Sequence, residues 1–219
     1  MAPAGGFIGM ARVPELPYLD DSSSYALSLH VVRQAAARLL DRESLAVEVA
    51  QAGLMCRQFP TMMDLGLPPE LWAFCLHGVG TWQHPHQFAD FLVFLQQDIA
   101  GHIDSYLEIG TGAGGSFVWV VESLLAIRAQ VRPASAVPFS ALALDTEVAG
   151  DWSNESNWCR GPFVQWLASR ADQGVMFFRG TLRELMSAHT VAHGVDLAFL
   201  DADHDFEGVM RDFTDLVGL

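Results

Sequence analysis

The second half of the chain alternates short apolar runs with helical patterns, and this alternation restricts the possible folds more than any other feature. The apolar runs predict strands at residues 106–109, 139–145, 175–179 and 195–201. Helical patterns follow these runs at 115–130, 162–172, 182–189 and from about Asp205 onward. Short apolar strands separated by helices are typical of a parallel sheet with right-handed crossovers. We therefore predict an α/β fold with a doubly wound parallel sheet.

Three features fall at the carboxyl ends of the predicted strands. A glycine turn over residues 110–115 follows the first strand, while Asp145 and Asp201 close the second and the fourth. Open parallel α/β sheets bind their ligands at the carboxyl ends of the strands. We therefore expect the turn and the two aspartates to form a ligand site.

The turn itself leaves several ligands open. Glycines allow the N–H groups at the start of a helix to approach a ligand that side chains would block. Gly110, Gly112 and Gly115 also fit the G-x-G-x-x-G pattern of dinucleotide sites. A tight strand-to-helix turn without any ligand is a further interpretation.

Two carboxylates refine this interpretation. Glu108 precedes the first glycine by two residues, where it can pair with a cationic ligand and where a pyrophosphate would be repelled. Asp145 lies 30 residues after Gly115 and can accept hydrogen bonds from ribose hydroxyls. Asp145 fits any nucleoside ligand, or a solvated acid at a strand end, whereas Glu108 favours a ligand with a positive charge.

Together, these motifs resemble those of the class I S-adenosylmethionine-dependent methyltransferases. Residues 108–115 resemble the first motif, 142–145 the second-strand acid and 179–182 the turn beside the adenine. Residues 195–211 resemble the fourth strand and following helix of the cephalosporin-hydroxylase-like and macrolide-sugar O-methyltransferases. The resemblance covers about residues 80–219 and implies a Rossmann-like sheet with strand order 3-2-1-4.

The resemblance also implies roles for individual residues. Glu108 and the glycine turn would hold the methionine end of the cofactor, Asp145 the ribose, and Thr181 with Leu182 the adenine. The implied cofactor-binding residues are Glu108, Gly110, Thr111, Gly112, Gly114, Asp145, Thr181, Leu182 and Asp201.

A D-x-x-H sequence supplies a magnesium ligand and a general base in the sugar O-methyltransferases, and Asp201 and His204 match it. His204 would be the catalytic residue, accepting the proton that the acceptor hydroxyl loses. Asp201 would bind Mg²⁺, which holds and acidifies a diol. The competing interpretation makes His204 a charged surface residue between Asp203 and Asp205, with Asp205 capping the next helix.

Residues 1–100 are predicted to form a helical N-terminal extension or cap, and residues 101–219 the S-adenosylmethionine-binding domain. Helical patterns in the extension cover 24–40, 42–52, 69–77 and 85–99. In relatives the segment around Gln83 packs near the cofactor turn, so we expect Gln83 to approach the site.

Relatives continue with a fifth strand beyond the residue that matches Leu219, so the resemblance implies a C-terminally incomplete sheet. Three explanations are open: the chain is a fragment, it completes its sheet by forming oligomers, or its helical N-terminal part covers the gap. The fourth strand would then be an exposed apolar edge at residues 197–200. Such an edge favours pairing with another chain, and we predict homo-oligomers through it.

Composition excludes other classes of partner. The chain has 26 acidic and 12 basic residues, a formal charge of −14, which disfavours nucleic acid. No apolar run is long enough to span a bilayer, and no targeting signal is evident, so we expect a cytoplasmic protein without membrane partners.

The function predicted from the sequence is methyl transfer from S-adenosylmethionine to an oxygen atom of a small molecule, such as a sugar or a phenol. One alternative is a non-catalytic, truncated methyltransferase-like binding module. Another is an NAD-dependent oxidoreductase, against which Glu108 argues.

Overall fold

The computed structural model describes residues 67, 69–81, 83, 91, 94, 95, 102–133, 137–146, 157–188, 194–202 and 205–218. The helices predicted over 24–40 and 42–52 lie outside these residues, as does most of the one over 85–99. Of the helix predicted over 85–99, only Phe91, Phe94 and Leu95 are described, and they are helical.

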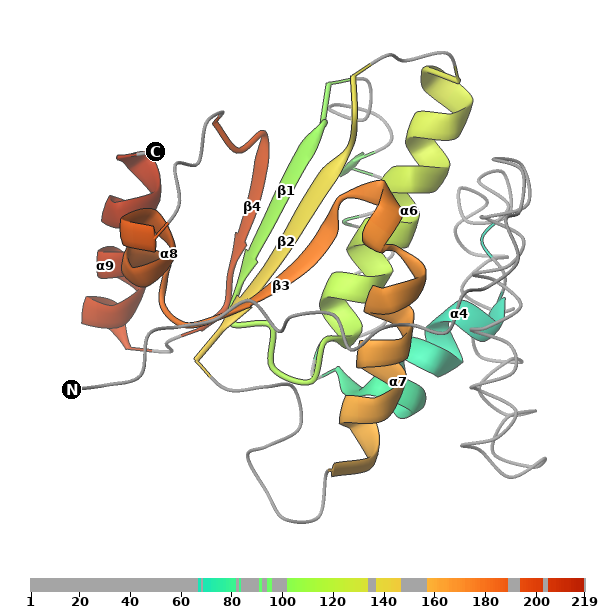
Figure 1. The fold of residues 1–219 in the computed structure, drawn as a ribbon, viewed down its shortest axis with the longest axis horizontal. Helices are drawn as coiled ribbons and strands as arrows, with labels where there is room; N and C mark the ends of the chain where they lie inside the picture. Colours follow the sequence, from blue (N-terminus) through green and yellow to red (C-terminus); the bar gives the residue numbers. More distant parts are fainter. Residues whose placement is uncertain are drawn as a thin grey trace.

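The described residues form one parallel sheet of four strands (Figure 1). The strands are β1 (Ser105–Ile109), β2 (Ser140–Asp145), β3 (Val175–Arg179) and β4 (Leu197–Leu200). Their spatial order is β3-β2-β1-β4, with every neighbouring pair parallel. The structure therefore confirms the α/β class and the predicted strand order. β4 is shorter than predicted because pairing with β1 covers only Leu197–Leu200.

Helices cover both faces of the sheet, giving three layers (Figure 1). One face carries α6 (Gly115–Val131) and α7 (Asn157–Ser169), together with α4 (Pro69–Ala73) and the π-helix η1 (Phe74–Gly80). The opposite face carries α8 (Leu182–Ala188) and α9 (Phe206–Val217). These positions agree with a doubly wound, Rossmann-like arrangement.

Strand alternation divides the core between these two layers. Tyr106 of β1 joins the larger core cluster under α6 and α7, while Leu107 and Ile109 join the smaller one under α8. A buried ion pair joins Arg170, the residue directly after α7, to Glu122 of α6, with 2.5 Å between Arg170 Nη2 and Glu122 Oε2. The Trp166 indole N–H also donates to Glu122 Oε1 over 2.8 Å. The larger layer therefore holds α6 and α7 as one packed unit behind the sheet.

Two helices differ from the boundaries that their patterns predict. α7 begins at Asn157, five residues before the predicted start, and continues through Pro162. It ends at Ser169, and a short 3₁₀ turn, η3 (Ala171–Gln173), replaces its predicted last turn. Gly174 closes this turn with a φ of 73°, a left-handed conformation that glycine adopts readily. The predicted helix over 69–77 changes into a π-helix after Ala73.

Within the described ranges, no helix is both long enough and apolar enough to cross a membrane.

Candidate active site

The structure brings the predicted acids together at the carboxyl ends of three neighbouring strands (Figure 1). The glycine turn joins β1 to α6, Asp145 is the last residue of β2, and Asp201 directly follows β4. Asp145 contacts the turn, because its Oδ2 accepts a 2.8 Å hydrogen bond from Gly112 N. Asp201 is held beside β1 by a 2.8 Å bond from its N–H to the Ile109 carbonyl.

Glu108 is the most deeply buried acid of this group. Its side chain is 0% exposed, and both carboxylate oxygens accept hydrogen bonds. The Tyr106 hydroxyl donates to Oε2 over 2.5 Å, and the Ser116 hydroxyl donates to Oε1 over 2.6 Å. The pKa of Glu108 is raised from 4.5 to about 8: burial raises it most, the hydrogen bonds from Ser116 and Tyr106 lower it, and the charges of Asp201 and Asp145 raise it. This carboxylate is thus placed where a cation would be strongly favoured.

The glycines of the turn are needed for the packing of the protein itself. Gly110, Gly112 and Gly114 have φ values of 86°, 56° and 101°, which side-chain-bearing residues rarely adopt. A Cβ at Gly110 would lie 2.2 Å from Ala202 Cα, and one at Gly114 would lie 2.5 Å from the Phe163 ring. A Cβ at Gly115 would meet the Gly80 carbonyl oxygen at 2.3 Å. These contacts explain three of the glycines without any ligand.

Hydrogen bonds tie the turn to the end of β2. The backbone N–H groups of Gly110 and Thr111 both donate to the Leu144 carbonyl, at 2.9 and 3.3 Å. The buried Thr111 hydroxyl donates to the same oxygen at 3.3 Å. No side chain caps the first turn of α6, since its N-cap residue is Gly114. The start of this helix therefore presents backbone N–H groups, which favour an anionic group of a ligand.

Gln83 reaches the site from the N-terminal part of the chain, as expected. Its side-chain Nε2 donates to Asp201 Oδ2 over 2.6 Å, a contact between residues 118 positions apart. One oxygen of Asp201 is thereby engaged by the protein.

Thr181 lies in the turn between β3 and α8, beside the end of β2, and Leu182 is the first residue of α8. The Gly180 N–H donates to the Asp145 carbonyl over 2.7 Å. This bond places the turn close to Asp145, the residue predicted to bind the ribose. Thr181 and Glu184 cap α8 reciprocally, and this bonding lowers the pKa of Glu184. The Leu182 side chain is buried in the smaller core cluster, so Thr181 is the exposed residue of the pair.

A protein-family model described as a methyltransferase domain matches residues 107–218, just over half of the 219 residues. The chain belongs to this methyltransferase family. The match begins inside β1 and includes the glycine turn, Asp145, Asp201 and all of α9. No curated protein matches the chain.

The predicted catalytic residue of this methyltransferase, His204, lies outside the described residues, as does Asp203. Asp205 is described, and its Oδ1 accepts a 2.7 Å hydrogen bond from Gly208 N, which confirms the predicted helix cap. Among the residues that the structure describes, no three histidine, cysteine or acidic side chains are grouped as metal ligands. Magnesium binding at Asp201 therefore stays a prediction.

Sequence reasoning missed the two hydroxyl donors to Glu108. Tyr106 and Glu108 are two residues apart on β1, so their side chains lie on the same face of the sheet. Ser116 is the second residue of α6, which begins directly after the turn. Both relationships could have been derived from the predicted strand and helix.

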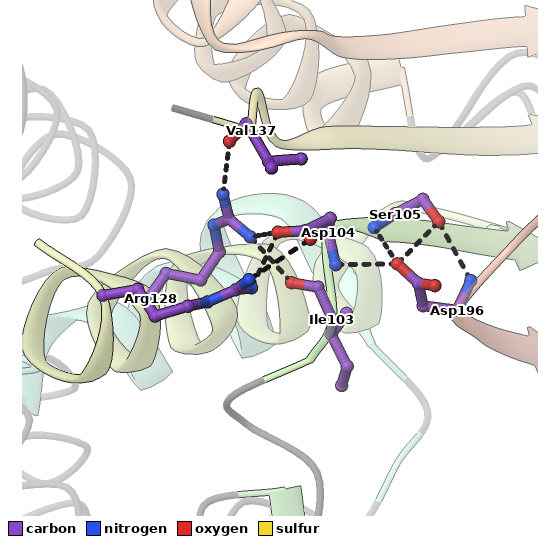
Figure 2. Close-up of polar contacts among 7 residues, drawn as sticks. Ile103, Asp104, Ser105, Arg128, Val137 and Asp196 are labelled. Carbon is purple, nitrogen blue, oxygen red and sulfur yellow. Dashed lines mark hydrogen bonds and ion pairs between the residues drawn. The ribbon is translucent and has the colours of Figure 1, made fainter. Parts of the chain in front are cut away.

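A second polar cluster of the methyltransferase lies at the amino ends of the strands (Figure 2). Arg128 of α6 forms an ion pair with Asp104 and donates to the Ile103 carbonyl over 2.9 Å. Its other terminal nitrogen donates to the Val137 carbonyl, also over 2.9 Å. The guanidinium therefore joins α6 to the segments that lead into β1 and β2.

In the same cluster, Asp196 links the beginning of β4 to the beginning of β1 (Figure 2). Its Oδ2 accepts hydrogen bonds from the backbone N–H groups of Asp104 and Ser105, at 2.8 and 2.9 Å, and from the Ser105 hydroxyl at 3.1 Å. Since ligands bind at the carboxyl ends of such sheets, this cluster serves the fold.

Proposed function

We propose that the chain is an S-adenosylmethionine-dependent methyltransferase that methylates an oxygen atom of a small molecule, such as a sugar or a phenol. The observation that carries this proposal is the buried Glu108 carboxylate at the end of β1, close enough to Asp145 and Asp201 for their charges to act on it. Membership of the methyltransferase family supports the reaction class.

The residues present fit this cofactor. S-adenosylmethionine carries a sulfonium and an ammonium group, and a concentration of three carboxylates favours such a cation. The same carboxylates would repel the pyrophosphate of a dinucleotide, which argues against an NAD-dependent oxidoreductase. The start of α6, which no side chain caps, suits the carboxylate of the methionine end.

In this proposal, Glu108 and the glycine turn hold the methionine end, Asp145 the ribose, and Thr181 with the backbone at Leu182 borders the adenine. When bound, the cofactor supplies the methyl group for in-line displacement. The protein aligns the acceptor oxygen with that group and removes its proton. We assign proton removal to His204, and acceptor orientation to Asp201 with Mg²⁺. Residues 1–100, as a helical extension, would border the acceptor side.

Calorimetric titration of the purified chain tests cofactor binding. S-adenosylmethionine and S-adenosylhomocysteine are the ligands, and NAD is the comparison. Asp145→Asn is the informative variant, because its amide oxygen can still accept the bond from Gly112 N while the carboxylate charge is lost. Asp172→Asn, at an exposed acid in η3, is the matched control.

We expect selective binding of the sulfur nucleosides, weakened at least about tenfold by Asp145→Asn and unchanged by Asp172→Asn. Selective NAD binding, or no binding by a folded chain, would contradict the proposal.

Turnover is a separate test of the same proposal. Methyl transfer to a panel of sugars and phenols, with and without Mg²⁺, should occur and should fall at least about a hundredfold in His204→Ala. Cofactor binding without transfer to any acceptor would favour the non-catalytic binding module instead.

A further inference from the structure

The Glu108 carboxylate is held by one hydroxyl donor on each oxygen. Tyr106 donates to Oε2 at 2.5 Å and Ser116 donates to Oε1 at 2.6 Å. All three side chains are buried: Glu108 is 0% exposed, Tyr106 2% and Ser116 8%. The carboxylate is therefore fixed in one orientation between two elements, β1 and the first turn of α6.

The surroundings of the two donors make their positions rigid. The Tyr106 ring stacks on Phe117, with 5.7 Å between ring centroids and 17° between planes. Ser116 lies beside Gly115, which itself packs against the Gly80 and Cys75 carbonyl oxygens. The ring stacking therefore fixes the direction of the Tyr106 hydroxyl, and the packing of Gly115 fixes the backbone that carries Ser116.

These two hydroxyls also oppose the forces that neutralise Glu108. Burial and the charges of Asp201 and Asp145 raise its pKa, whereas the bonds from Tyr106 and Ser116 lower it. A carboxylate accepts hydrogen bonds more strongly than a carboxylic acid does, so both donors favour the charged form.

We propose that Tyr106 and Ser116 are positioning residues that orient the Glu108 carboxyl group and favour its charged form, so that the site selects the cationic methionine end of its cofactor. This inference rests on the proposed function. It assigns a role in ligand selection to two residues that need not contact the ligand.

Tyr106→Phe and Ser116→Ala test this assignment, because each removes only a hydroxyl. Phenylalanine preserves the stacking on Phe117. The binding constants for S-adenosylmethionine, S-adenosylhomocysteine and 5′-methylthioadenosine, which lacks the amino-acid end, are measured from about pH 6 to about pH 10, so that the range covers the titration of Glu108 in the wild type and in the variants. We expect each variant to bind the first two ligands about tenfold more weakly near neutral pH, and the third unchanged.

The pH profile separates positioning from a merely structural effect. Loss of a donor raises the pKa of Glu108 further, so the rise of affinity with pH should move up by about one unit in each variant. In a Glu108→Gln background, Tyr106→Phe should have no further effect on the affinity ratio. Ser123→Ala is the matched control, since this buried serine of α6 donates only to the Trp119 carbonyl within its own helix.

A readout without ligand distinguishes this inference from the proposed function. The ionisation of Glu108 can be followed by NMR of ¹³C-labelled glutamate carboxyl groups in the ligand-free chain. An upward shift of its titration in Tyr106→Phe and Ser116→Ala supports the inference, and an unchanged titration with unchanged ligand ratios overturns it. A wild-type chain that shows the titration but binds no sulfur nucleoside overturns the proposed function and, with it, the role in selection.

Discussion

At the residue scale, burial of the Glu108 carboxyl group carries an energetic cost. Glu108 is buried, and the charges of Asp145 and Asp201 act on it in the same direction as burial. Its two hydroxyl donors offset this cost only in part, because the pKa stays near 8. A cationic ligand would offset the cost of the buried negative charge. The site is therefore less stable in the ligand-free protein than in the complex.

We therefore predict that the free energy of unfolding decreases as pH rises from about 4.5 to about 8, the unfolded and folded pKa values of Glu108. In this window the unfolded state has lost the proton that the folded state still binds. The contribution is roughly 1.4 kcal/mol for each pH unit at most. Urea denaturation of the wild type and Glu108→Gln should give a difference that grows with pH.

The difference between these two proteins isolates Glu108 from the other titrating groups. Parallel stability profiles for wild type and Glu108→Gln would show that burial does not perturb this carboxylate.

At the scale of elements, the glycine turn connects three parts of the structure. It packs against Ala202 after β4, the Phe163 ring of α7 and the carbonyl oxygens of η1. The turn is therefore a junction of the fold as well as the proposed cofactor site.

We predict that Gly110→Ala lowers the free energy of unfolding by at least about 2 kcal/mol without any ligand. The new Cβ would meet rigid backbone at 2.2 Å, at a φ of 86°. Gly194→Ala is the control, because a Cβ there meets nothing within 4 Å. Equal denaturation midpoints for the two variants would show that the turn relaxes freely.

The polar cluster at the amino ends of the strands should affect stability and leave the site intact. Asp196→Ala removes the acceptor of three hydrogen bonds that join β4 to β1. We expect a loss of about 1–2 kcal/mol in urea denaturation, and unchanged affinity for S-adenosylmethionine. Asp172→Ala, at the exposed acid of η3, should change neither quantity. A large loss of affinity in Asp196→Ala would mean that the two ends of the sheet are coupled.

At the scale of the whole molecule, the strand at one edge of the described sheet, β4, is half-buried, and the helix beside it exposes apolar side chains. β4 is the last strand of the sheet, and α9 beside it exposes 79% of Phe206, 50% of Phe213 and 70% of Val217. Exposed apolar surface next to a strand edge favours association.

We predict that the chain forms homo-oligomers through this edge. Sedimentation velocity should show a mass above 24.0 kDa that decreases on dilution, and Phe206→Asp with Phe213→Asp should give the monomer. A wild-type chain that sediments as a monomer at every concentration would contradict this prediction.

Much of the fold could be predicted because each step depends on local pattern. Alternating strands and helices predict the parallel sheet, and chain order then places Asp145 and Asp201 beside the turn. The contact between Gln83 and Asp201 could not be derived from spacing, since it joins residues 118 positions apart. The start of α7 was also missed, because a helix that continues through Pro162 depends on packing rather than on propensity.

The packing of the glycine turn has a consequence for how this lineage can change over evolutionary time. Gly110, Gly114 and Gly115 are required by neighbouring backbone and ring atoms, so selection for a folded chain retains them even after catalysis is lost. Asp145 and Glu108 are under a different pressure, because relief of their mutual repulsion would be stabilising once no cation has to be bound. Among descendants of this chain, retention of the two acids should therefore indicate that methyl transfer is retained, whereas retention of the glycines should indicate only common ancestry.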